Sequence, residues 1–275
     1  MIRYLVGAIS ASLSLGAMAN EAAFEQADAL FAERENNIEA TQQARDAYLS
    51  IAATASSEDL VRAVVGAART LIYEGEALTG RDSDEDIESR RSIFRSCYTE
   101  VMPLINPEAL GFESPAYYYF TASCMAYYAE VSGTLENLRN IRALNEALEN
   151  GLSLQGGELY EGGGLNRVKA AVKSNPKAKP IPGGLYNPEV ALELIEAAIE
   201  GEAYPGGVEG ALFCDNFRRK VNVLAELDRS EEALEVAEIA IDEFGFLLEL
   251  DEIPSVIVAE TKHCIKVIEE IAETL

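Results

Sequence analysis

The chain has 275 residues, of which 48% are hydrophobic and 25% are charged, enough apolar side chains for the core of one extended domain or two small ones. This composition excludes disordered, fibrous and polytopic membrane proteins. With 22 basic against 47 acidic residues the formal net charge is −25. Such a surface repels nucleic acid and anionic membrane faces, because phosphates carry the same sign.

The first residues are typical of an export signal. Arg3 gives a short basic start, the apolar stretch over 5–15 is too short to span a membrane, and residues 17–19 fit the small-x-small cleavage pattern. We therefore predict a signal peptide over 1–19 and a mature protein that starts at Asn20, is periplasmic or secreted, and has no membrane span. The alternative is an N-terminal amphipathic helix that packs on the rest of the chain.

Apolar residues recur at spacings of three and four along most of the remaining chain, which indicates amphipathic helices. The helices expected in chain order cover residues 21–34, 37–52, 57–77, 83–104, 116–131 and 134–150. Ser83 is followed by acids in the first turn and Asn187 by a proline, and both patterns are helix-start signals. No alternation of apolar and polar residues is long enough to predict a strand, so the expected fold is all-α, with short connectors that favour antiparallel neighbours.

An irregular insert interrupts this pattern over residues 153–186. Paired and tripled glycines, and then prolines, break the helical periodicity there. Within the insert we expect a short helix over 165–172 and a long loop over 174–186. The whole of 20–275 is nevertheless predicted to be one helical-repeat domain that contains this insert.

Four cysteines follow the predicted signal peptide, and an even number in an exported protein permits disulfides. Cys97 and Cys124 fall on helices that are adjacent in sequence, and Cys214 and Cys264 fall in the last helical segments. Of the three possible connectivities we predict these two local pairs. The alternative is four buried free thiols, because cysteine is a common core residue. No CxxC occurs and there is one histidine, so neither a metal site nor a cofactor is predicted.

One register of aromatic, aliphatic and small residues recurs in hairpins near both ends of the chain. The recurring positions are Phe24, Ala27, Phe31, Ala40, Ala44 and Ala47 in the first hairpin and Phe217, Val221, Leu224, Ala233, Ala237 and Ala240 in a late one. Small residues let two helices approach closely, and each hairpin then leaves an apolar face that only a neighbouring hairpin can bury. This repetition predicts a stack of hairpins.

These hairpins, together with the turn Asp228-Arg229-Ser230-Glu231-Glu232-Ala233, resemble the tetratricopeptide repeat (TPR). The resemblance implies a right-handed α-solenoid of about five antiparallel hairpins with a concave groove, although the tryptophan of that family is absent throughout. The exported all-helical layout is also similar, more crudely, to the periplasmic T-component proteins of TRAP transporters. Against that similarity, no cysteine for a lipid anchor follows the apolar run.

Basic and aromatic side chains in and after the insert are the candidate binding residues. First helices line the groove of TPR-like stacks, so the resemblance implies that the basic run around Arg219 grips a carboxylate. The glycines between Tyr160 and Arg167 would let a ligand approach the same groove. The full set of candidate binding residues is Tyr118, Tyr160, Asn166, Arg167, Asn216, Arg219 and Lys220. The alternatives are internal ion pairs for the basic residues and core packing for the tyrosines.

No catalytic motif accompanies these residues. His263 neighbours Cys264 on a helix, where adjacent side chains point about 100° apart and cannot form a dyad. The sequence therefore predicts a non-enzymatic exported protein that binds a protein or peptide through its groove, with a transporter or solute-binding protein as one possible partner. One alternative is a component that binds a small organic acid for a transporter, and a less favoured one is an all-α enzyme that relies on carboxylates or tyrosines.

Overall fold

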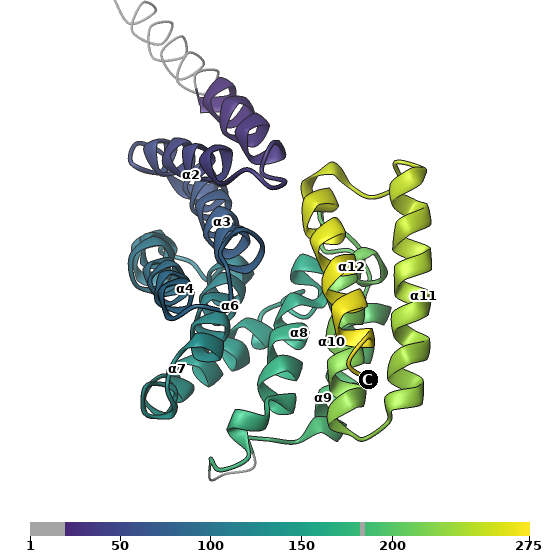
Figure 1. The fold of residues 1–275 in the computed structure, drawn as a ribbon. Coiled ribbons are helices and arrows are strands. Elements are labelled where there is room, and N and C mark those ends of the chain that lie inside the picture. Colours follow the sequence, from purple (N-terminus) through teal and green to yellow (C-terminus); the bar gives the residue numbers. More distant parts are fainter. Residues whose placement is uncertain (1–19, 182–184) are drawn as a thin grey trace, which may run out of the picture.

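The computed structural model describes residues 20–181 and 185–275, and every regular element in these residues is helical (Figure 1). The all-α prediction is confirmed, whereas the predicted signal peptide over 1–19 lies outside the described residues. After a helical stretch over 20–32, the longer helices are α2 (Ile38–Ala52), α3 (Ser57–Tyr73), α4 (Asp84–Ser96), α6 (Pro115–Val131), α7 (Thr134–Ser153), α8 (Tyr160–Ser174), α9 (Pro188–Glu200), α10 (Cys214–Glu226), α11 (Ser230–Glu249) and α12 (Val258–Ala272). The shorter segments are η1 (Glu74–Leu78), η2 (Cys97–Val101), η3 (Met102–Ile105), α5 (Pro107–Leu110), η4 (Pro176–Ala178), η5 (Gly210–Leu212) and η6 (Ser255–Ile257).

Two predicted helix starts are capped by side chains. The hydroxyl of Ser83 accepts a hydrogen bond from the backbone N–H of Asp86, and the Asp86 carboxylate accepts one from the backbone N–H of Ser83. Asn187 caps α9 by accepting from the N–H of Val190. The helix expected over 57–77 is less regular than predicted, since after Tyr73 it continues as the π-helix η1, a geometry that is frequent at functional sites.

The helices in the C-terminal two thirds of the chain form two layers. Helices that follow one another pack in pairs, α6 on α7, α8 on α9 and α10 on α11, and alternate helices also touch, α6 on α8, α8 on α10 and α10 on α12. The small residues predicted on α11 lie at such a contact, because Ala233, Ala237 and Ala240 are fully buried. As a result α6, α8, α10 and α12 form one layer, which faces the interior of the molecule.

The first and last segments of the described chain meet. Arg34, just after the 20–32 helix, is 1% exposed and donates hydrogen bonds to the carboxylate of Glu260 on α12 and, at 2.8 Å, to the carbonyl of Val256 in η6. Beside it, Lys262 lies 2.7 Å from the carboxylate of Glu35. Figure 1 shows α12 next to the turn between the 20–32 helix and α2. These contacts close the helical array around a central space.

Both predicted cysteine pairs lie at disulfide distance. The Cα atoms of Cys97 and Cys124 are 5.9 Å apart, and those of Cys214 and Cys264 are 6.1 Å apart. The first pair joins η2 to α6, and the second joins the first residue of α10 to α12. The second disulfide therefore holds two walls of the central space together.

Candidate functional site

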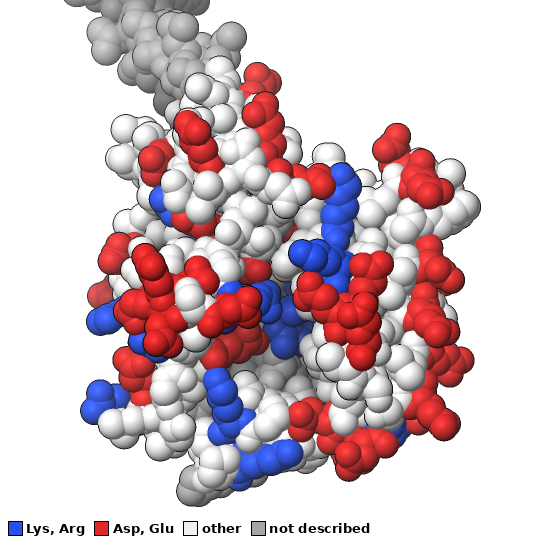
Figure 2. All heavy atoms as spheres, in the orientation of Figure 1, with Lys and Arg blue, Asp and Glu red and all other residues white. Residues whose placement is uncertain are grey.

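A cavity of about 150 Å³ occupies the central space, between α3, η1 and α6 on one side and α8, α10 and α12 on the other. Its charged and titratable lining residues are Arg69, Glu76, Glu161, Arg167, Asp215, Arg218, Glu260 and His263. Its aromatic lining residues are Tyr73, Tyr119, Phe120, Tyr127 and Phe213. Figure 2 shows basic side chains gathered in the hollow between the two halves of the molecule, while acidic side chains dominate the surrounding face. The cavity thus combines cationic and aromatic groups in an acidic protein.

The start of α8 carries Glu161 into the cavity through a left-handed turn. Glu161, Gly162 and Gly163 have φ angles of 53°, 57° and 78°. A side chain costs free energy in this conformation, which favours glycine. A Cβ on Gly162 would lie 2.1 Å from the ring of Phe213, and one on Gly163 would lie 2.6 Å from the Cα of Ala198. The glycines therefore break the right-handed helix, as the sequence predicted, and the regular part of α8 follows them and ends at Ser174, close to the predicted 165–172.

Arg167 holds this turn in place by donating hydrogen bonds to its carbonyls. It is 4% exposed, its Nη1 donates to the side-chain oxygen of Asn216 at 2.7 Å, and its Nη2 donates to the hydroxyl of Tyr119 at 3.0 Å. Both Nη atoms also donate to the carbonyl of Glu161 at 3.3 Å, and Nε lies 3.2 Å from the Asp215 carboxylate. Every guanidinium nitrogen of Arg167 has a protein partner. The structure therefore places this predicted ligand-binding residue at the centre of an internal network.

Asn216 belongs to the same network. It is fully buried, and its amide donates to the carbonyls of Gly162 at 2.9 Å and Gly210 at 2.8 Å. Of the seven candidate binding residues, Arg167 alone lines the cavity, and Asn216 accepts a hydrogen bond from it outside the lining.

The other five candidates lie outside the cavity lining. Tyr118 is buried among α6, α7 and α8, and Tyr160 packs edge-to-face on Tyr119 and Tyr204. Arg219 pairs with Glu130 at 3.4 Å, Lys220 pairs with Glu196 at 2.9 Å, and Asn166 is half-buried on α8. The groove predicted from Tyr160, Arg167 and Arg219 does not form as one surface.

Two buried arginines share the carboxylate of Asp215. Arg218, one turn further along α10, contacts Oδ1 through Nε and Nη2, and Arg167 approaches Oδ2. Burial alone would raise the pKa of Asp215, but the charges of Arg218, Arg219 and Arg167 outweigh burial and hold that pKa well below its usual range. Asp215 is therefore ionised and is outnumbered by guanidinium groups, which leaves an excess of positive charge at this wall.

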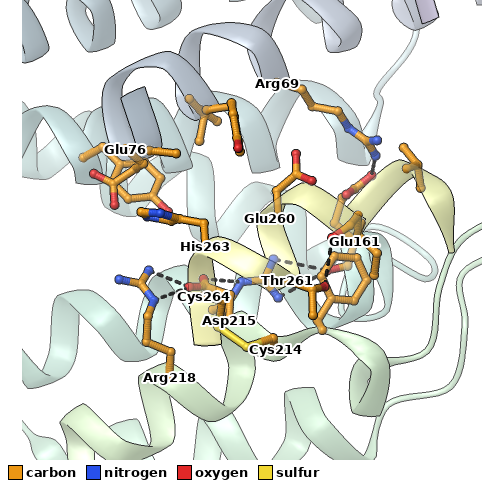
Figure 3. Close-up of a pocket in the computed structure, with 18 of the residues that line it drawn as sticks. Arg69, Glu76, Glu161, Cys214, Asp215, Arg218, Glu260, Thr261, His263 and Cys264 are labelled. Atoms are coloured by element: carbon orange, nitrogen blue, oxygen red, sulfur yellow. Dashed lines mark hydrogen bonds and ion pairs between the residues drawn. A yellow bond between two sulfur atoms is a disulfide. The ribbon is translucent and has the colours of Figure 1, made fainter. Parts of the chain in front are cut away.

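His263 faces the cavity from α12. In Figure 3 its imidazole lies between Glu76 and the guanidinium of Arg218. The Cys214–Cys264 disulfide sets this arrangement, because Arg218 lies one turn after Cys214 and His263 directly precedes Cys264. Burial lowers the pKa of His263 below its usual value, Glu76 opposes this effect and Arg218 adds to it. The imidazole is therefore neutral at neutral pH.

Salt bridges surround the cavity, and arginines outnumber acids in them. The pairs are Arg81 and Arg90 with Glu76, Arg69 with Glu161, Arg167 and Arg218 with Asp215, and Arg34 with Glu260. Three of these six arginines, Arg34, Arg81 and Arg90, lie outside the cavity lining, so the lining itself holds three arginines and four carboxylates, 3 − 4 = −1, in a chain whose net charge is −25. The lining is thus close to charge balance, and positive charge is in local excess around Asp215, where Arg167 and Arg218 share one carboxylate.

The sequence did not indicate most of these residues. Arg69, Glu76 and Glu260 come from three separate helical segments, and nothing local distinguishes them from the many other charged residues of amphipathic helices. Arg218 belongs to the basic run on α10, in which the sequence predicts Arg219 and Lys220 as binding residues. The helix register is a signal that could have identified Arg218, because it follows Cys214 by four residues and so lies on the same face of the helix.

Among the residues that the structure describes, no group of three or more histidine, cysteine, aspartate or glutamate side chains is placed to hold a metal ion. In that same part of the chain, no helix combines the length and the apolar character that crossing a membrane requires. A scan of protein-family models gives no match for the chain, and comparisons with curated proteins and with solved structures give none either.

Proposed function

We propose that this protein is an exported, non-enzymatic binding protein whose central cavity holds a small organic acid with an aromatic or apolar body. The observation that carries the proposal is Arg218, a buried guanidinium that lines the cavity and shares one carboxylate with Arg167. An incoming carboxylate would compensate this excess charge through charge-assisted hydrogen bonds, which arginine makes strongly.

The shape and lining of the cavity support a guest of this kind. A volume of about 150 Å³ admits a compact molecule rather than a folded partner. The rings of Tyr73, Phe120 and Tyr127 offer edges and faces on which an aromatic or apolar body can pack. The local excess of positive charge where Arg167 and Arg218 share Asp215 would also attract an anion. The role that fits is the ligand-binding component of a transporter, one of the two functions that the sequence favours.

The architecture in this proposal is a TPR-like, right-handed solenoid. Contacts between alternate helices α6, α8, α10 and α12 support it, because stacked hairpins make such contacts along one layer. The resemblance of the late hairpin to the tetratricopeptide repeat supports it as well.

A protein partner is the second candidate, and the outer helix α11 favours it. Ile239, Phe246 and Leu250 are 45%, 59% and 49% exposed, and their spacings of seven and four place them on one side of α11. Exposed apolar side chains that gather on one side of a helix are a feature of docking sites. A transporter subunit bound here would leave the cavity free for a ligand.

Export has its own test. We expect protein isolated from its host to begin at Asn20, because residues 17–19 form a cleavage pattern, and to contain the Cys97–Cys124 and Cys214–Cys264 disulfides. Intact-mass spectrometry and non-reducing peptide mapping measure both. A retained Met1, or four thiols open to alkylation, would contradict the proposed location.

The cavity is tested with benzoate as the probe acid. We expect benzoate to bind and Arg218→Ala to weaken its binding about 10- to 100-fold, as the loss of a charge-assisted hydrogen bond of about 1.5–3 kcal/mol predicts. Isothermal titration calorimetry measures the affinity, with benzylamine as the cation of matched shape.

The matched control variant is Arg219→Ala. Arg219 lies on the same helix but outside the cavity lining, with Glu130 as its partner, so benzoate affinity should fall much less in this variant than in Arg218→Ala. Preferential binding of benzylamine, or an equal loss in both variants, would overturn the proposal.

A further inference from the structure

His263 is the only histidine of the chain, and it lines the cavity from α12. Among the described residues no hydrogen bond to either ring nitrogen is present, although the side chain is half-buried and lines the cavity. The ring nitrogens are not among the described buried polar atoms that lack a partner, so they are accessible from the cavity. An imidazole whose nitrogens are accessible in this way is therefore available to a ligand.

Charged and titratable groups face this part of the cavity from every helix packed around it. They are Glu76 of η1, Arg81 of the following loop, Tyr127 of α6, Asp215 and Arg218 of α10, and Glu260 of α12 itself. The other charged and titratable lining groups are Arg69 and Tyr73 of α3, Tyr119 of α6, and Glu161 and Arg167 of α8. Asp215 stays ionised beside its arginines, and burial raises the pKa of Tyr127 above its usual value, so that its phenol stays neutral. Glu76 and Glu260 are held in ion pairs with arginines. Near neutral pH, His263 is the group in this set that is suited to gaining or losing a proton.

We propose that His263 and Arg218 hold the carboxylate of the acid between them, and that His263 takes up one proton from solvent as the acid binds. This inference rests on the proposed function and adds to it the control of uptake and release by pH. The proton adds to the free lone pair of the imidazole, both ring nitrogens become donors, and no covalent bond forms with the acid. Binding then favours acidic surroundings and release favours alkaline ones.

The physical cause is the change in charge around His263. In the empty cavity, burial and Arg218 both disfavour the imidazolium form. A carboxylate placed between the two side chains adds a negative charge next to the imidazole, and so favours its protonated form. By linkage, a ligand that favours protonation is itself bound more tightly when protons are more abundant.

The test is calorimetric titration of the mature protein with benzoate between about pH 5.5 and 8, a range in which a carboxylic acid is ionised. Running each pH in two buffers with different ionisation enthalpies gives the number of protons taken up. In the unmodified protein we expect proton uptake approaching one and an affinity that falls up to about tenfold per pH unit as the pH rises. In His263→Gln, which retains a donor, we expect no uptake and no such slope.

Two further measurements separate a binding role for His263 from a structural one. Lys262→Gln removes the adjacent cation, which pairs with Glu35 outside the cavity lining, and should keep the pH slope. Because the chain has a single histidine, NMR resolves its imidazole directly, and its titration midpoint should move to higher pH when benzoate is added.

The outcomes distinguish the two proposals. Failure of benzoate to bind at any pH overturns the proposed function. Binding that depends on Arg218 while the NMR midpoint stays fixed, or while His263→Gln shows the same proton uptake as the unmodified protein, overturns the role of His263 alone. If His263→Gln lowers the melting temperature and weakens benzoate binding equally at all pH values, the role of His263 is structural.

Discussion

Replacing Arg167 with methionine is expected to lower the free energy of unfolding by about 3–5 kcal/mol, the usual cost of removing one partner from a buried charged network. The variant leaves the side-chain oxygen of Asn216, the hydroxyl of Tyr119 and the carbonyl of Glu161 without their donor. Methionine fills part of the space but offers no hydrogen bond in return. Each polar group left unsatisfied in the interior adds to the loss.

Urea unfolding followed by circular dichroism measures this loss, and Arg219→Met is the matched control. Arg219, on α10, makes a single long contact, 3.4 Å to Glu130, so we expect a change of less than about 1 kcal/mol. Similar losses in the two variants would show that the network around Arg167 contributes no more than a surface pair. A stable Arg167→Met protein with weakened benzoate binding would instead return Arg167 to the ligand-binding role that the sequence indicated.

The case of Arg167 shows what the sequence could and could not predict about the site. The glycines and the arginine stood out together, and we interpreted them as a surface that admits a ligand. In the structure these residues instead stabilise one another, because the carbonyls of the left-handed turn at Glu161 and Gly162 accept hydrogen bonds from Arg167 and Asn216. The local pattern identified an unusual backbone correctly, but Asn216, which completes the network with Arg167, lies 49 residues away from Arg167 in sequence.

Features that depend on neighbouring residues were predictable. Apolar spacing located the helices, capping residues located the starts at Ser83 and Asn187, and proximity along the chain selected the two cysteine pairs. The ion pairs around the cavity were not predictable, because any arginine among 22 basic residues has 47 acids as possible partners. Their choice depends on how distant helices pack, which periodicity does not encode.

The tyrosines of α6 illustrate the same limit at one helix. The sequence shows that they cannot all face one core, and in the structure Tyr119 and Tyr127 line the cavity. Tyr118, the candidate chosen from the sequence, lies nine residues before Tyr127 and so points to the opposite side of the helix at about 100° per residue. It is buried instead against α7 and α8. Periodicity gave the relative directions of these rings but not which direction leads to the cavity.

The left-handed turn can be tested by replacing Gly163 with alanine, which we expect to lower the free energy of unfolding by about 2–5 kcal/mol. A positive φ of 78° costs an alanine about 1–2 kcal/mol. The added Cβ would also lie 2.6 Å from both the Cα and the Cβ of Ala198, a residue that is itself fully buried. Relieving this overlap must move α8 or α9, and overpacking of that kind costs about 1–3 kcal/mol more.

Gly111→Ala separates the two contributions, because Gly111 has a φ of 76° but nothing within 4 Å of an added Cβ. It should therefore show the conformational cost alone, and the difference between the two variants in urea unfolding measures the packing of the turn against α9. Equal losses of unfolding free energy in the two variants would mean that α9 shifts at no cost to accommodate the new methyl group. Since the turn also positions Glu161 against Arg69 in the cavity wall, Gly163→Ala should weaken benzoate binding as well, whereas Gly111→Ala, which lies at the end of α5 and away from the cavity lining, should not.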